Sequence, residues 1–141
     1  MRLVVVAIAT AAALAAQTAD GGSSLDFEFF KARVQPILLN KREGHARCYV
    51  CHSTGTPYRL QRLSPGASTW NDEQSRKNYE ATVNMVNLRD LGASPLLTYP
   101  LAQSAGGNRF HPGGKHWESK SDAEWKILDE WVHGHKITAS K

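Results

Sequence analysis

Two cysteines stand three residues apart, and a histidine follows the second one directly: Cys48, Cys51 and His52. Two thiols at this spacing can add across the two vinyl groups of one haem, and the adjacent histidine is placed to bind the iron from one side. The sequence therefore predicts one haem c, attached at Cys48 and Cys51, with His52 as the proximal ligand of the iron. Tyr49 and Val50, which lie between the cysteines, are expected to add no chemistry.

Two other fates are open to this cysteine pair. A redox-active disulfide of the thioredoxin kind needs a preceding strand in a βαβ pattern, and no such strand is predicted upstream. A zinc site could join Cys48 and Cys51 to His111 and His116, but 59 residues separate Cys51 from His111, unlike the compact spacing of zinc fingers. The chain has no other cysteine, so it cannot form a framework of structural disulfides.

The amino terminus predicts export. Arg2 precedes an apolar run over 3–16 that is shorter than the roughly 20 residues of a membrane span, and small residues offer cleavage sites between Ala15 and Ala19. We therefore expect a signal peptide over 1–19, with an uncleaved anchor as the alternative. Covalent haem attachment in bacteria belongs to the far side of the cytoplasmic membrane, so a periplasmic or secreted location agrees with the cysteine motif.

The remaining chain is long enough for one domain. We expect a flexible lead-in over 20–26 and a single domain over 27–141, with no transmembrane segment after cleavage. The formal net charge of the whole chain is +4, and no basic tract is interleaved with aromatic residues. This composition argues against a nucleic-acid partner and allows mild electrostatic attraction to an acidic redox protein.

Apolar residues recur at helical spacing near the start of this domain. Phe27, Phe30 and Val34 predict a helix that begins after Ser24 and ends near Val34, because Pro36 disfavours helical geometry at the residue before it.

The rest of the domain is also predicted to be helical, with long loops and almost no strand. A loop over 59–70 is expected first, followed by a helix over 72–87 that a capping box of Asn71 and Gln74 begins. A short helical turn over 96–99 after a Ser94 cap and an irregular segment over 102–116 come next. The last helix is expected to begin with a capping box of Ser121 and Glu124, to bury Trp125, Leu128 and Val132, and to end at Gly134. The predicted fold class is all-α, a small domain built around one haem.

This order resembles that of the small class I cytochromes c, in which the second axial ligand is usually a methionine in the loop before the last helix. Met85 is the only methionine after the signal segment, and it lies well before that loop. The loop instead carries a His-Pro-Gly-Gly segment at 111–114, which is similar to the H-x-G-G stretch of cytochrome-like haem modules in planctomycete and acidobacterial secreted proteins. Three further stretches of the likeness, which spans residues 27–134, are VQPIL at 34–38, SPLL at 94–97 and DEWV at 129–132.

The resemblance implies that His52 is the proximal ligand and His111 the distal one, with two glycines allowing the backbone to approach the haem closely. Met85, His116 and an open or water-bound sixth site remain alternatives. The other histidines, His45, His133 and His135, are expected at the surface.

The implied function is single-electron transfer by a monohaem cytochrome with protein redox partners, and not an enzymatic reaction. Two alternatives stay open: a module whose open sixth site binds or senses a small ligand, and a peroxidase-like haem protein that uses a distal histidine with Arg109.

Overall fold

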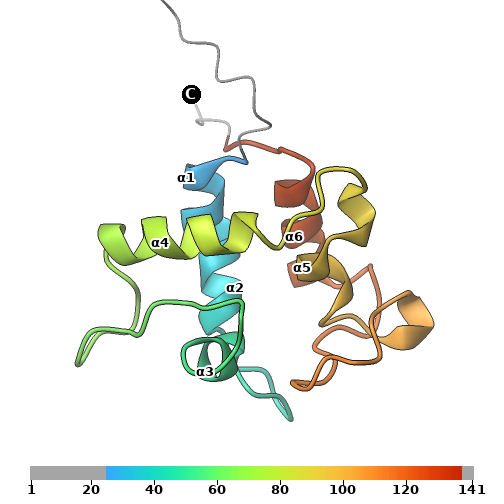
Figure 1. Ribbon diagram of the computed structural model, residues 1–141, viewed down its shortest axis with the longest axis horizontal. Coiled ribbons are helices and arrows are strands. Elements are labelled where there is room, and N and C mark those ends of the chain that lie inside the picture. The colour runs from blue at the N-terminus through green and yellow to red at the C-terminus, as the bar shows by residue number, and fades with distance from the viewer. Residues whose placement is uncertain (1–24, 138–141) are drawn as a thin grey trace, which may run out of the picture.

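The computed structural model describes residues 25–137, and this part of the chain is all-α, as predicted (Figure 1). The only β-type pairing within it is an isolated parallel bridge between Leu101 and Trp117. No helix in this range is long and apolar enough to cross a membrane. The predicted signal peptide over 1–19 lies outside the described residues. The elements in chain order are α1 (Phe27–Phe29), η1 (Phe30–Val34), α2 (Gln35–Leu39), α3 (Cys48–His52), α4 (Asp72–Val83), η2 (Leu91–Ala93), α5 (Pro95–Thr98), η3 (Gln103–Ala105) and α6 (Ala123–Val132).

The first three elements form one continuous helix, so the prediction that it ends near Val34 is wrong. Gln35 keeps helical angles (φ −55°, ψ −42°), and the helix runs on to Leu39. The segment η1 is a π-helical turn in which the Gln35 N–H donates to the Phe30 carbonyl. A π turn is wider than an α turn, which gives the ring of Pro36 room and lets the helix continue past it.

The domain begins earlier than its predicted boundary at 27. Leu25 is buried in the core, and the Asp26 side chain caps α1 by accepting a hydrogen bond from the Phe29 N–H at 2.5 Å. The Asp26 carbonyl also accepts from the indole of Trp131 in α6 at 2.9 Å. The last two residues of the expected flexible lead-in are therefore an ordered part of the domain.

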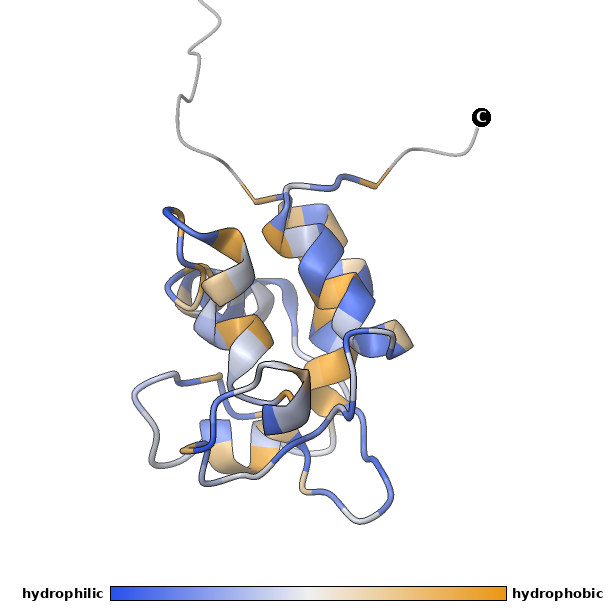
Figure 2. Ribbon diagram, turned by 90° about the vertical axis from the view of Figure 1, so that its right-hand side faces the viewer, coloured by the Kyte–Doolittle hydropathy of each residue, from blue (hydrophilic) through white to orange (hydrophobic). Residues whose placement is uncertain are grey.

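The core lies where the first helix, α4 and α6 meet (Figure 1). Its centre is an aromatic cluster in which the Phe30 ring lies 5.5 Å from Trp131 and 5.6 Å from Tyr79, centre to centre. Both pairs bury a large area, and the Phe30–Tyr79 pair also has the favourable edge-to-face geometry. The exposed sides of these helices are hydrophilic, as the colouring of Figure 2 indicates. The predicted buried residues of α6, Trp125, Leu128 and Val132, all belong to this core.

Helix α4 starts with the predicted capping box, since the Asn71 side chain accepts from the Gln74 N–H and the Gln74 side chain accepts from the Asn71 N–H. It ends at Val83, before the predicted 87. Its most buried side chains, Ser75, Asn78 and Thr82, are polar, and one of them holds the loop over 59–70. The side-chain carbonyl oxygen of Asn78 accepts a hydrogen bond from the Gln61 N–H at 2.7 Å.

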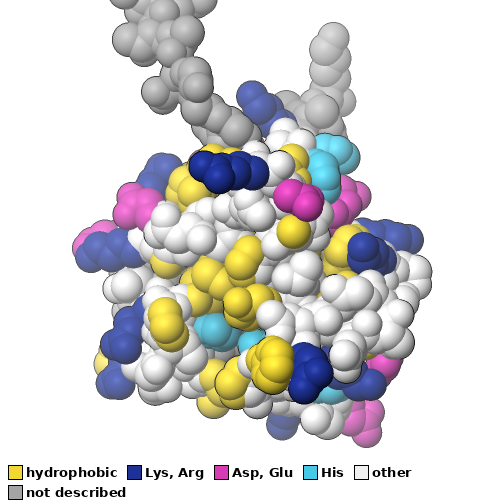
Figure 3. Space-filling model, turned by 45° about the vertical axis from the view of Figure 1, so that its right-hand side comes forward, with side chains coloured by type: hydrophobic (Ala, Val, Ile, Leu, Met, Phe, Trp, Pro, Cys, Tyr) yellow, Lys and Arg dark blue, Asp and Glu magenta, His cyan; other side chains and the backbone are white. Residues whose placement is uncertain are grey.

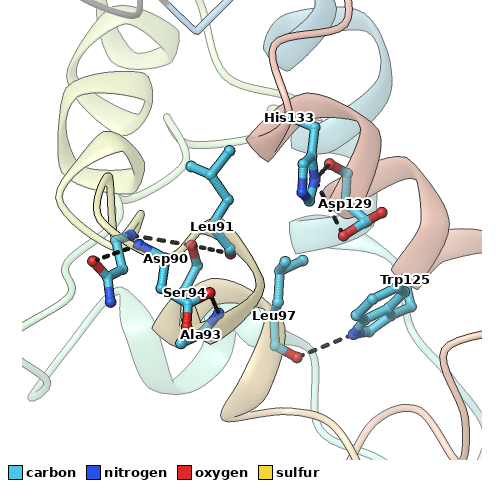
Figure 4. A network of polar contacts seen from close by, with 9 residues as sticks. Asp90, Leu91, Ala93, Ser94, Leu97, Trp125, Asp129 and His133 are labelled. Atoms are coloured by element: carbon cyan, nitrogen blue, oxygen red, sulfur yellow. Dashed lines mark hydrogen bonds and ion pairs between the residues drawn. The ribbon is translucent and has the colours of Figure 1, made fainter.

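Two predicted caps are not formed, because other hydrogen bonds engage the same side chains. The Ser94 hydroxyl accepts from the Asn87 N–H and donates to the Leu91 carbonyl, so it closes the turn before α5 (Figure 4). Glu124 belongs to no capping box with Ser121, since its carboxylate instead accepts hydrogen bonds from residues distant in sequence. The predicted end of α6 is confirmed: Gly134 follows it with a left-handed φ of +81°.

Candidate functional site

The cysteine motif forms its own short helix, α3, at the end of the loop that follows α2. Both cysteines are free; Cys51 is exposed and Cys48 is partly buried. Burial raises the pKa of the Cys48 thiol, and the nearby guanidinium of Arg42 only partly opposes this. The two thiols are therefore unpaired and carried on adjacent turns of one helix.

His52 closes this helix and is held through one side of its ring. Its Nδ1 lies 2.9 Å from the Tyr58 carbonyl and 2.9 Å from the Thr56 hydroxyl. A carbonyl can only accept, so Nδ1 carries the proton and Nε2 keeps its lone pair. Burial lowers the pKa of His52, which keeps the ring neutral at pH 7. A neutral imidazole with a bare Nε2 is a good metal ligand.

The second histidine, His111, is carried by a loop over 108–117 that is fixed at both ends. At its start the Asn108 N–H donates to the Thr98 carbonyl at 2.8 Å, and at its end Ala102 N–H donates to the Trp117 carbonyl at 2.8 Å. Just before the loop, a Cβ on Gly107 would stand only 1.8 Å from the Leu101 carbonyl oxygen, so only glycine fits there.

The two glycines after His111 serve the ring itself. The His111 Nδ1 lies 2.7 Å from the Gly114 carbonyl, so here too Nδ1 donates and Nε2 keeps its lone pair. A Cβ on Gly113 would stand 3.2 Å from Cε1 of the ring, so a side chain at this position would push against His111. Gly114 has a φ of +72°, a conformation that favours glycine.

The structure brings His52 and His111 together across 58 intervening residues of chain. Their ring centres are 6.3 Å apart, and their planes differ by 14°. Within residues 25–137, neither Nε2 has a hydrogen-bond partner. Figure 3 shows histidine side chains in the middle of a hydrophobic area on one face, with lysine and arginine side chains around its border. The arrangement can place two imidazole nitrogens on one metal in apolar surroundings.

The other two proposed sixth ligands, His116 and Met85, have different surroundings. His116 lies 6.3 Å from His111 and 5.5 Å from His45, centre to centre, and no ring contact joins it to His52 among the described residues. Burial, together with the positive charges of neighbours led by Arg42, lowers the pKa of His116 to about 4. Met85 packs against the hydrophobic core.

Of the three histidines expected at the surface, two are exposed and one is not. His133 and His135 follow α6 and are exposed, and His133 interacts with Asp129 (Figure 4). His45 is half-buried beside His116, so the expectation for it is wrong.

No three His, Cys, Asp or Glu side chains within residues 25–137 gather as ligands of a single metal ion. The cysteine pair with His111 and His116 therefore forms no zinc site in this arrangement. No strand precedes α3 in the described chain, which also leaves the thioredoxin-like alternative without its βαβ context.

Sequence reasoning missed residues that hold the site. Tyr49, expected to add nothing, accepts a hydrogen bond from the Leu63 N–H at 3.0 Å and packs edge-on against Trp70. The Arg42–Glu124 ion pair was also missed, because nothing local links residues 82 positions apart. The tyrosine could have been noticed as an aromatic next to a cysteine, whereas the ion pair gave no local signal.

Comparisons of this chain with protein-family models, with curated proteins and with solved structures found no match. The resemblance to cytochrome-like haem modules therefore rests on the residues of this chain alone.

Proposed function

We propose that this protein is an exported monohaem c-type cytochrome that transfers single electrons, with His52 and His111 as the two axial ligands of its iron. Cys48 and Cys51 would hold the haem covalently. The observation that carries the proposal is the spacing of the two histidine rings.

If two imidazoles bound one iron from opposite sides, each metal–nitrogen bond would be about 2.0 Å long. Each nitrogen lies about 1.15 Å from the centre of its ring, so the two ring centres would be about 6.3 Å apart. The His52 and His111 centres lie 6.3 Å apart. Aromatic rings that pack directly on one another also have centres about 4.5–7 Å apart, so the distance agrees with an iron between the rings without requiring one. The assignment therefore depends equally on the Nε2 atoms, which have no hydrogen-bond partner among the described residues.

The hydrogen bonds behind the two rings support the same assignment. Histidines that bind metals usually donate their other ring N–H to a carbonyl or carboxylate, which fixes the tautomer and makes the ligand more basic. His52 has the Tyr58 carbonyl in this position, and His111 has the Gly114 carbonyl. Both rings are thereby held in the tautomer that leaves Nε2 available to iron.

The thiols would attach the haem without an oxidant or reductant. Each sulfur forms a bond to one carbon of a vinyl group while the thiol hydrogen goes to the other carbon, so the reaction is a balanced addition. Cys51 is exposed, whereas Cys48 is partly buried and packs against the core, so the haem would reach Cys51 from solvent and Cys48 from the side of the core.

The haem would supply the ferric–ferrous couple, and the chain would set the conditions of the transfer. Both histidine rings are half-buried, and two strong nitrogen ligands would stabilise ferric iron. The reduction potential should therefore lie below that of a His/Met cytochrome, since thioether ligation favours ferrous iron. The partners would be other redox proteins in the periplasm or outside the cell.

The decisive experiment is spectroscopy of the purified mature protein, combined with its mass and a pyridine haemochrome assay. We expect one covalent haem and six-coordinate, low-spin spectra in both redox states. His111→Ala should convert the ferric protein to a high-spin or water-bound form, whereas the control variants His116→Ala and Met85→Leu should keep the low-spin spectrum.

Three results would contradict the proposal. A mass without haem would exclude the cofactor. A near-infrared methionine-to-iron charge-transfer band in the oxidised protein would assign the sixth position to Met85. A high-spin ferrous spectrum with fast carbon monoxide binding in the unmodified protein would favour a small-ligand-binding module over an electron carrier.

A further inference from the structure

One carboxylate joins the two segments that carry the histidines. The Glu124 side chain, near the start of α6, accepts hydrogen bonds from Asn40 Nδ2 at 2.7 Å, Arg42 Nε at 2.5 Å and Trp117 Nε1 at 3.2 Å. Arg42 also forms an ion pair with Glu124 through Nη2 and lies over the Trp117 ring, 5.2 Å from its centre. We call these four residues the Glu124 cluster.

The cluster is well shielded from water. The side chains of Arg42 and Glu124 are 13% and 25% exposed, respectively. Burial alone raises the pKa of Glu124, but the hydrogen bonds from Asn40, Arg42 and Trp117 outweigh it and leave this pKa below its ordinary value. The carboxylate is therefore charged at neutral pH, and charge-assisted hydrogen bonds of this kind are the strong ones.

The position of each partner along the chain gives the cluster its significance. Arg42 lies in the loop that leads into α3 and hence to His52. Trp117 ends the loop over 108–117, six residues after His111. Glu124 lies on α6, which is anchored in the core by four buried side chains, Trp125, Leu128, Trp131 and Val132, so it is a fixed point to which both loops are attached.

We propose that the Glu124 cluster is a positioning device that sets the distance between His52 and His111 and so keeps the sixth coordination position closed to external ligands. This inference rests on the proposed function, because it concerns how tightly the distal histidine is held on the iron. Without the Trp117–Glu124 hydrogen bond, the loop that carries His111 would be held less firmly. His111 would then leave the iron more often, and an external ligand could bind in its place.

The test is the rate at which carbon monoxide binds to the ferrous holoprotein, measured for two variants. Glu124→Ala removes the common carboxylate, and we expect binding about tenfold faster or more, with a high-spin fraction in the ferric spectrum. Trp117→Phe keeps an aromatic ring beneath Arg42 and removes only the indole donor. It is the milder variant, for which we expect about a threefold increase.

The matched control is Leu128→Ala, one helical turn after Glu124 in the same helix. Leu128 is 1% exposed and packs in the core, so its truncation loosens α6 without touching either loop. We expect this variant to lose thermal stability as Glu124→Ala does, while its rate of carbon monoxide binding stays within about twofold of the unmodified protein.

Unchanged binding rates in both cluster variants would overturn the positioning role, as would an equal acceleration in Leu128→Ala, which would indicate general loosening. The mass of the unmodified protein separates this failure from that of the proposed function. A protein without covalent haem fails at that first step and refutes both, whereas a low-spin haem protein with insensitive variants refutes the positioning role alone.

Discussion

Replacement of Gly113 by alanine isolates the packing of the His111 ring. The new methyl would lie 3.2 Å from Cε1 and 3.5 Å from Nε2 of that ring. Carbon atoms prefer a separation of about 3.5–4.0 Å, so the ring has to move by about 0.3–0.8 Å. The backbone at Gly113 does not have the positive φ that would by itself disfavour alanine.

A shift of this size matters for metal binding, since ligand distances in working sites vary by only about 0.2 Å. If His111 is the distal ligand, Gly113→Ala should weaken the bond and produce a mixed-spin ferric spectrum. Carbon monoxide should bind about tenfold faster, which corresponds to about 1.4 kcal/mol. The unfolding free energy should change by less than about 1 kcal/mol, because no core contact is altered.

Absorption spectra and stopped-flow mixing with carbon monoxide measure both effects. Gly66→Ala is the control. Gly66 has a φ of +77°, and no atom lies within 4 Å of an added Cβ, so this substitution adds backbone strain in the loop over 59–70 without a steric contact. It should lower stability by about 1 kcal/mol and leave the spectra unchanged. If Gly113→Ala has the spectrum and binding rate of the unmodified protein, the assignment of His111 from its ring position is refuted.

Three further predictions concern stability. Burial and nearby positive charge give His116 a folded-state pKa of about 4, below its ordinary value of 6.5, so the unfolded chain takes up a proton first as the pH falls. The free energy of unfolding should therefore fall between pH 6.5 and pH 4 by up to about 3 kcal/mol, and by about half of that once the partial exposure of the ring is considered. Urea unfolding of His116→Gln at several pH values should lack this part of the pH dependence. Glu124→Gln leaves the positive charge of the Arg42 guanidinium without a paired negative charge, so it should lower the free energy of unfolding by about 2–3 kcal/mol. Chemical denaturation measures this loss, and a loss below about 0.5 kcal/mol would argue against a strong ion pair. Gly107→Ala should destabilise by more than about 3 kcal/mol in thermal unfolding, since its Cβ would stand 1.8 Å from a backbone oxygen, and an unchanged midpoint would contradict this close approach.

Features that depend on a few neighbouring residues could be predicted from the sequence. The capping box at Asn71 and Gln74 is one example, and the left-handed stop at Gly134 is another. Both are decided by hydrogen bonds or backbone angles within one helical turn. The helical periodicity of Trp125, Leu128 and Val132 likewise predicted which side of α6 is buried.

Predictions failed where a local preference competed with a distant contact. Pro36 was expected to end the first helix, but packing of the residues on both sides of it makes the helix continue through a π turn. Glu124 was expected to cap its own helix and instead accepts three hydrogen bonds from residues outside α6. The tertiary contacts outweigh a cap that is worth about 1 kcal/mol at Glu124 and a helix-breaking preference of about 3 kcal/mol at Pro36.

The sequence by itself determined the chemistry that is available to this chain: two thiols and a histidine within five residues, and an all-α domain to carry them. Only the tertiary structure decided which of the candidate side chains lies beside His52. His111, His116 and Met85 were all open from the sequence, because 32 or more residues separate each of them from His52 and spacing along a chain does not fix distance in space. The fixed ends of the loop over 108–117 bring the His111 ring to within 6.3 Å of His52, and the carbonyl of Gly114 orients it there.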